Sequence, residues 1–139
     1  MNARPYEIIE GLLYSEDHFW IKEEENGVCV VGLTDYGQHC VGDILYLEID
    51  GEAGDVAAGR SFGSLEAGKW VGGLISPLNG VLREVNAALS DRPGIINEDP
   101  YGAGWIIKAE RTGDFPAGLM DGAASGDFVE EEIESEGAE

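Results

Sequence analysis

The sequence is poor in basic residues, with 8 lysines and arginines against 28 aspartates and glutamates, a formal net charge of −20 over 139 residues. A charge of this sign repels the phosphate backbone of nucleic acids and the surface of anionic membranes. It keeps a protein soluble and can steer it toward partners that carry basic patches. We therefore exclude nucleic acid and membranes as partners.

Cysteine is equally scarce. Cys29 and Cys40 are the only two and lack CxxC spacing, which excludes a disulfide framework and a cysteine metal motif. They are candidates for a redox role, or for a structural one as small buried hydrophobes. His18 and His39 have no second ligand at suitable spacing, so we predict structural roles for both and no metal site.

Long hydrophobic runs are missing as well. The apolar residues near the N-terminus are interrupted by Glu7, Glu10 and Gly11, which excludes a signal peptide or a spanning helix there and predicts a cytoplasmic protein. The chain also lacks a nucleophile elbow, a phosphate-binding glycine loop followed by Lys-Ser/Thr, and a metal cluster. We therefore expect a non-catalytic protein.

Glycine is abundant, with 21 residues, and it separates short apolar runs rich in Val, Ile, Leu and aromatic residues. This rhythm is typical of a mainly β fold made of many short strands. Turn signals lie at Glu25-Asn26-Gly27, Asp50-Gly51 and Asn79-Gly80. The predicted strands are His18 to Glu23, Val28 to Leu33, Ile44 to Ile49, Arg60 to Glu66, Gly73 to Ser76, Gly80 to Val85 and Trp105 to Ala109.

The helices are expected to be short. Thr34 can cap a helix from Asp35 to Cys40, and Asn86 to Ser90 can form a turn. Near the C-terminus, helical spacing predicts a helix from Gly126 to Glu136 with Asp127 as its N-cap, and the acidic residues Glu134 to Glu139 predict a frayed, disordered end. We accordingly divide the chain into one domain, residues 1–128, and an acidic C-terminal tail, residues 129–139.

The most informative segment runs from Arg60 to Gly80, where two apolar strands flank a tip of small residues. The tip contains Lys69, one of only three lysines in the chain. An acylated lysine must project from a tight turn so that an enzyme can reach its ε-amine and the finished arm can swing. An exposed lysine is usually an ordinary solvated charge. Evidence that Lys69 is modified must therefore come from the surrounding sequence.

Several blocks around this segment agree in order and spacing with one family. The tip shows Gly63, Glu66, Lys69, Pro77 and Gly80 in the pattern Gly, Glu-x-x-Lys, Pro-x-x-Gly. The other blocks are Tyr14-x-x-x-His18-x-Trp20, Gly32-Leu33-Thr34-Asp35-x-x-Gln38, Gly42-Asp43-Ile44, Glu84-Val85-Asn86 and Asn97-x-Asp99-Pro100-Tyr101-Gly102-x-Gly104-Trp105. In these blocks the chain resembles the glycine-cleavage H-protein family, from about Tyr14 to Phe128.

The resemblance implies a barrel-sandwich hybrid fold of the lipoyl type, with two small sheets packed face to face. It implies that lipoate is attached covalently to Lys69 by a lipoate–protein ligase or lipoyl transferase. The arm would then carry an intermediate between partner enzymes, because tethering a dithiol/disulfide pair raises its effective concentration at each partner. Glu66 would help the attaching enzyme to recognise the site.

The sequence departs from that family around the lysine, where it reads Glu66-Ala67-Gly68-Lys69-Trp70-Val71-Gly72-Gly73. Gly68, Gly72 and Gly73 predict a flexible tip, and Trp70 either packs on the hairpin or contacts the arm or a partner. This departure resembles the lipoate-binding proteins of heterodisulfide-reductase-like sulfur oxidation, with which Cys29 and Cys40 are compatible. We favour sulfur oxidation with a heterodisulfide-reductase-like complex, with glycine cleavage and its enzymes as the alternative.

Two other classes remain open. A biotin carrier also places a lysine on a hairpin, but such carriers usually have methionine on both sides of it, and here the neighbours are Gly68 and Trp70. An unmodified interaction module could keep the fold and lose the arm, although Lys69 in register argues against it.

Overall fold

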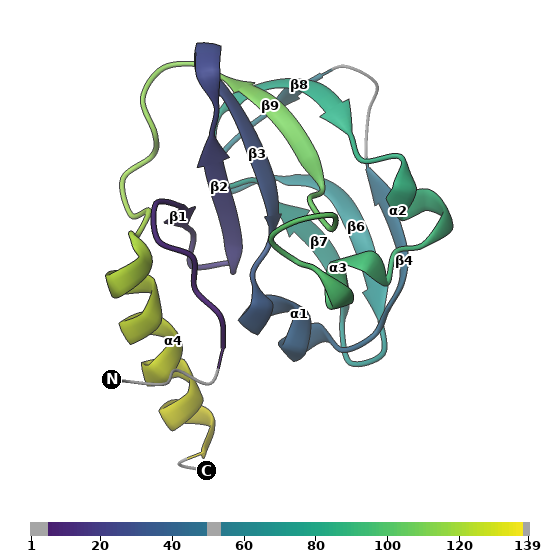
Figure 1. The fold of residues 1–139 in the computed structure, drawn as a ribbon, viewed down its shortest axis with the longest axis vertical. Helices are drawn as coiled ribbons and strands as arrows, with labels where there is room; N and C mark the ends of the chain where they lie inside the picture. Colours follow the sequence, from purple (N-terminus) through teal and green to yellow (C-terminus); the bar gives the residue numbers. More distant parts are fainter. Residues whose placement is uncertain (1–5, 50–53, 138–139) are drawn as a thin grey trace.

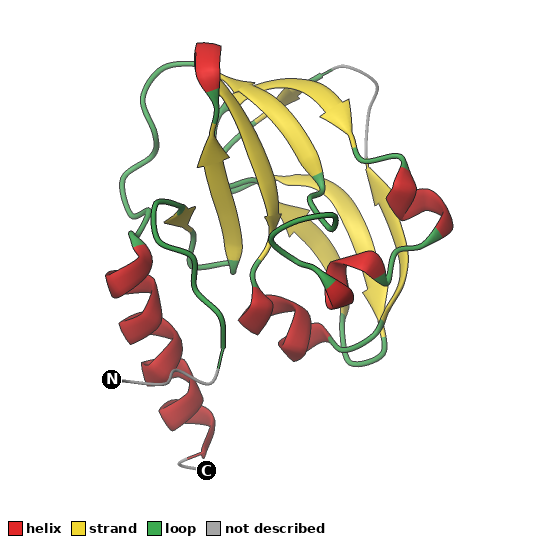
Figure 2. Ribbon diagram, in the orientation of Figure 1, coloured by secondary structure: helices red, strands yellow, loops and turns green. Residues whose placement is uncertain are grey.

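Two antiparallel sheets form the body of the fold in the computed structural model, which describes residues 6–49 and 54–137. The larger sheet has the strand order β1-β2-β3-β9-β8-β5, and the smaller has the order β4-β6-β7. Figure 1 shows the smaller sheet facing the larger one, with the helices at the periphery in Figure 2. The larger sheet contains β1 (Leu13–Tyr14), β2 (Phe19–Glu23), β3 (Val28–Leu33), β5 (Asp55–Val56), β8 (Gly80–Val85) and β9 (Ile107–Arg111).

The smaller sheet carries the lysine hairpin. Its strands are β4 (Ile44–Ile49), β6 (Ser61–Ala67) and β7 (Val71–Ile75). Side chains alternate across it, so that Phe62, Leu65 and Leu74 are buried while Ser64 and Glu66 face solvent. The buried residues join inward-facing residues of the larger sheet in one core, which includes Phe19, Ile21, Val31, Ile107 and Ala109. The prediction of a mainly β fold with two sheets packed face to face is thus confirmed.

Strand boundaries differ from the predictions where pairing, not composition, decides them. β7 begins at Val71, two residues before the predicted Gly73, because Val71 and Gly72 pair with β6. β9 runs from Ile107 to Arg111 instead of from Trp105, because its partners on β3 and β8 extend to that end. The two-residue strands β1 and β5 were not predicted.

The turn signals have mixed outcomes. Asn26 and Gly27 have positive φ, +64° and +76°, in the short 3-10 turn η1 (Glu25–Gly27), as predicted. Asp50-Gly51 lies outside the described residues. Gly80 lies at the start of β8 without a positive φ, and glycine is needed there because a Cβ would lie 2.5 Å from the Glu110 carbonyl oxygen.

Three short helices flank the sheets: α1 (Asp35–Val41), α2 (Ala88–Asp91) and α3 (Ile95–Glu98). The Thr34 hydroxyl accepts from the Gly37 amide over 3.0 Å, which confirms the predicted cap of α1. α2 begins two residues after the predicted Asn86, whose side chain accepts from the Ala88 amide. α3 was not predicted.

The C-terminal helix α4 (Gly122–Gly137) is longer than predicted. Its first turn is capped by Asp121, which accepts from the Ala124 amide, so the prediction of Asp127 as N-cap was wrong. The predicted disorder from Glu134 was also wrong as far as Gly137, because the helix continues that far. Val129 is buried against the domain. The division at residue 128 stays a prediction, and the helix crosses that position without a break.

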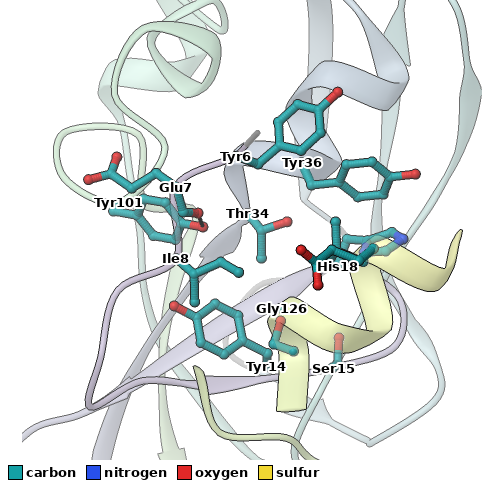
Figure 3. A pocket seen from close by; sticks show the side chains of 13 residues that line it. Tyr6, Glu7, Ile8, Tyr14, Ser15, His18, Thr34, Tyr36, Tyr101 and Gly126 are labelled. Atoms are coloured by element: carbon teal, nitrogen blue, oxygen red, sulfur yellow. Dashed lines mark hydrogen bonds between the residues drawn. The ribbon is translucent and has the colours of Figure 1, made fainter. Parts of the chain in front are cut away.

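Aromatic side chains lie beside α4. Figure 3 shows Tyr14, Tyr36, Tyr101 and His18 around a cavity of about 10 Å³ beside this helix. The Tyr14 hydroxyl donates to the Ile9 carbonyl over 2.7 Å, and His18 Nε2 lies 3.1 Å from a carboxylate oxygen of Glu132. Among the described helices, none is long and apolar enough to cross a membrane.

Candidate functional site

Lys69 lies at the tip of the β6–β7 hairpin, where the chain reverses through Gly68 and Lys69. The Ala67 amide donates to the Trp70 carbonyl over 2.9 Å and closes the turn. Lys69 is exposed, so its amine can be approached from solvent. The prediction that Lys69 occupies a hairpin tip agrees with this geometry.

The main chain of the turn is bonded to another segment. The Gly68 amide donates to the Asp43 carbonyl over 2.9 Å, and the Lys69 amide donates to the Val41 carbonyl over 2.8 Å. In Figure 1 this segment, the end of α1 and the link from it to β4, runs beside the hairpin tip. Since two consecutive amides are fixed in this way, the backbone that carries the lysine has a defined position.

Gly42 makes the close approach possible. Its dihedral angles, φ +84° and ψ −162°, fall in a region that is essentially restricted to glycine. A Cβ at this position would lie 3.1 Å from Lys69 Cγ and 3.4 Å from the Lys69 amide nitrogen. Gly42 therefore lets the loop pass directly under the stem of the lysine.

Asn97 of α3 fixes that loop, and sequence reasoning did not single it out. Its Oδ1 accepts from the Ile44 amide over 2.9 Å, and its Nδ2 donates to the Gly42 carbonyl over 3.0 Å and to Gln38 Oε1 over 2.9 Å. Asn97 belongs to one of the family-like blocks, but its partners lie more than fifty residues away. Its role could not be read from local spacing.

Glu66 lies on the outer side of the hairpin. It pairs with Tyr46 of β4 and with Val71 of β7, and its side chain is exposed. A carboxylate in this place is accessible to a partner that approaches Lys69.

Trp70 covers the inner side of the same hairpin. A Cβ on Gly72 would lie 2.5 Å from the Trp70 ring, so the indole rests on Gly72 while 43% of Trp70 remains exposed. Gly72 and Gly73 lie inside β7 and pair with Leu65 and Ser64. Gly72 thus makes room for an aromatic ring, and the Gly68 amide is hydrogen-bonded; the flexible tip stays a prediction.

A cleft of about 260 Å³ opens beside the hairpin on the Trp70 side. Its walls are largely apolar, and Glu16 and Asp17 supply carboxylates. It is lined by Glu16, Asp17, His18, Phe19, Leu33, Gly37, Cys40, Val41, Leu65, Trp70, Gly73, Leu74 and Ile75. A hydrocarbon chain and a dithiolane ring, both apolar, fit such a surface.

The two cysteines lie in different surroundings and are not joined by a disulfide. Cys29 is 0% exposed in the core, and burial raises the pKa of its thiol. Cys40 is exposed and lines the cleft. Of the two, Cys40 alone lies where a redox partner could reach it.

The two histidines pack against tyrosines. The His18 ring contacts Tyr36 edge-on with 4.9 Å between centroids, and His39 lies 5.1 Å from the Tyr6 ring. Within residues 6–49 and 54–137, no group of three or more His, Cys, Asp or Glu side chains could hold a metal ion. The chemistry that this site offers is an exposed primary amine, which can form an amide with a carboxylic acid.

Comparison with known proteins gives a consistent result. The family model described as "Glycine cleavage H-protein" matches residues 12–132. The glycine cleavage system H protein of Anaeromyxobacter sp. (strain K) is 44% identical over 128 residues, which cover 91% of this chain and 98% of that protein. The protein of the same name from Listeria monocytogenes serotype 4b (strain F2365) is 46% identical over 100 residues, 71% of this chain and 78% of that one.

A solved structure shares the fold. The crystal structure of a glycine cleavage system H protein from Mycobacterium marinum superposes with a TM-score of 0.79 at 31% identity, covering 90% of this chain and 98% of that chain. The barrel-sandwich prediction is thereby confirmed. H proteins are non-catalytic carriers with lipoate covalently attached to a lysine. The chain belongs to the glycine-cleavage H-protein family.

Proposed function

We propose that Lys69 is the lysine that bears lipoate, and that the chain carries an aminomethyl group between the enzymes of glycine cleavage. The observation that carries this proposal is the exposed lysine on a turn whose two central amides are bonded to the Val41–Asp43 loop. An arm attached there starts from a fixed point and can still swing.

The residues around Lys69 fit the cofactor. Lipoate supplies a disulfide that opens to accept a group and closes when the group has left. The chain's own part is to hold the attachment point and to offer the apolar cleft beside Trp70, where a loaded arm can rest out of water. Glu16 and Asp17 at that cleft can attract a positively charged amine.

Glycine cleavage replaces sulfur oxidation as the favoured process. The names of the relatives support it, and nothing among them supports a heterodisulfide-reductase-like partner. The partners in this proposal are therefore the lipoate-attaching enzyme and the glycine-cleavage enzymes, in the cytoplasm.

The test is the intact mass of the protein purified from its own host, followed by peptide mapping. We expect one lipoyl group on Lys69, and we expect the modified protein, but not a Lys69→Arg control, to support consumption of glycine by purified glycine-cleavage enzymes. A biotin-sized increase would assign the chain to the biotin carriers. An unmodified Lys69 in a host with working lipoylation would leave an interaction module. Lipoylated protein that supports no glycine consumption would make sulfur oxidation the favoured process again.

A further inference from the structure

Large apolar side chains are exposed next to the lysine hairpin. Among the described residues, the large hydrophobic residues that are exposed are Leu45 (61%), Tyr46 (55%), Trp70 (43%), Val71 (72%) and Val85 (38%). Single exposed hydrophobic residues are ordinary, but a contiguous group marks an interaction site. The first four belong to the hairpin or to β4, the strand beside it.

Three residues form a row across the outer face of the smaller sheet. Tyr46 pairs with Glu66, and Glu66 pairs with Val71. Paired residues on antiparallel strands point to the same side, with Cβ atoms about 5 Å apart. The row Tyr46, Glu66 and Val71, called here the outer row, is therefore a carboxylate between two apolar side chains.

An irregularity in β4 causes the exposure of this surface. Pairing between β4 and β6 is irregular between Ile44 and Tyr46, so Leu45 and Tyr46 are both exposed although they are consecutive. A regular strand would have turned one of them inward. The next row, Leu47, Leu65 and Gly72, faces the core side.

We propose that the outer row is the docking surface for the enzyme that attaches lipoate to Lys69, an inference that rests on the proposed function. Before modification, the amine lies only one side chain away from the turn, so this enzyme must approach the turn itself. Enzymes that act on the finished lipoyl arm contact its dithiolane end, which lies farther from the turn. Beyond the role of Glu66 implied by the family resemblance, this proposal assigns Tyr46 and Val71 as apolar contacts.

The charge of the surface specifies the partner. The strands β4, β6 and β7 contain no lysine or arginine, and Glu48, two residues after Tyr46, adds a second exposed carboxylate on the same face. The complementary surface therefore has a basic group at its centre, opposite Glu66, with apolar groups on both sides of it. A second copy of this chain would place like charges together, and its net charge of −20 disfavours such pairing.

The test compares initial rates of lipoylation by the host's lipoate–protein ligase, with ATP and lipoic acid, followed by intact mass. We expect the double variant Tyr46→Thr/Val71→Thr to lose about tenfold or more in kcat/KM, mainly through KM. Val81→Thr on β8 makes the same change in the other sheet and should react at the normal rate. Glu66→Gln should weaken the dependence of KM on salt.

A second measurement separates docking from other roles. Variants lipoylated to completion should support glycine consumption at the rate of the unsubstituted protein. Rates of lipoylation within twofold of the unsubstituted protein would overturn the inference. An equal loss of rate in both assays would also overturn it, because the surface would then belong to the glycine-cleavage enzymes. A change from dimer to monomer on substitution would overturn it by assigning the surface to a second copy of this chain. Failure of the unsubstituted protein to take lipoate would refute the proposed function itself.

Discussion

The side-chain amide of Asn97 donates to the main-chain carbonyl of Gly42 over 3.0 Å, across 55 residues of sequence. Gly42 in turn lies under the stem of Lys69. These two residues connect α3 to the lysine turn, although neither is at the amine that we propose to be modified.

Replacement of Asn97 should loosen this connection. Asn97→Ala leaves the Ile44 amide and the Gly42 carbonyl without their partner, and we expect a loss of about 1–3 kcal/mol in the free energy of unfolding. The rate of lipoylation at Lys69 should fall as well. Urea unfolding and intact mass measure the two effects. Gln38→Ala, which removes one of the bonds to Asn97, should cost less; an equal cost would contradict this account.

A side chain at position 42 should be poorly tolerated. Gly42→Ala forces a residue with a Cβ into dihedral angles that favour glycine and places that Cβ close to Lys69, so we expect about 1–3 kcal/mol of destabilisation. Gly94→Ala is the matched control, because Gly94 has φ −64° and no atom within 4 Å of the added Cβ. Urea unfolding that shows equal stability for the two variants would argue against the role assigned to Gly42.

Trp70 should leave its place when Gly72 acquires a Cβ. In Gly72→Ala the Cβ would meet the indole at 2.5 Å, and the exposed ring can swing into solvent. We expect a red shift in tryptophan emission and easier quenching by acrylamide, with a change in stability below about 1 kcal/mol. Gly68→Ala, whose Cβ would make only ordinary contacts at 3.9 Å, should leave the emission unchanged. Unaltered quenching in the Gly72 variant would show that Trp70 does not rest there.

Stability should fall in alkali. Burial is the main cause that raises the pKa of Tyr14, Tyr36 and Tyr101 above the ordinary value of 10.0. Below pH 10 both states are protonated; above it the unfolded state ionises first. Each tyrosine that stays protonated then removes up to about 1.4 kcal/mol per pH unit. Urea unfolding at several pH values should show this slope, with a smaller one in Tyr14→Phe. A flat profile to pH 11 would refute the prediction.

The two thiols should differ in reactivity. We expect one thiol per folded chain to react with a disulfide reagent at pH 8, and Cys40→Ser to abolish that reaction. Cys29 should react only after unfolding, because it is fully buried and burial raises the pKa of its thiol. Rapid reaction of both thiols in the folded protein would contradict these positions.

The features that were predicted correctly from the sequence are those that depend on residues close together in the chain. The strands Val28–Leu33, Ile44–Ile49 and Gly80–Val85 were predicted with the observed bounds, because each is an apolar run between turn signals. The Thr34 cap depends on a hydroxyl and an amide three residues apart. In α4 the observed N-cap is Asp121 and not Asp127. Gly122 and Gly126, which are poor helix formers, gave no sign in the sequence that the helix begins after Asp121.

Long-range contacts were beyond such reasoning. Family-like spacing indicated Lys69, but the amides of its turn are bonded to main-chain carbonyls, which any residue type provides. The placement of Trp70 on Gly72 depends on the register between β6 and β7. Strands β1 and β5 contain two residues each, too few for any periodicity.

The lysine turn is bonded to residues Val41–Asp43, and that segment is bonded to Asn97. Lys69 therefore reaches its observed position only late in the folding of the chain. A peptide that spans the hairpin alone lacks both partners. A growing chain lacks Asn97 until most of the protein has been synthesised. Under the proposed function, we therefore expect attachment of lipoate to a correctly held turn to follow folding, so that the modification marks molecules that have folded.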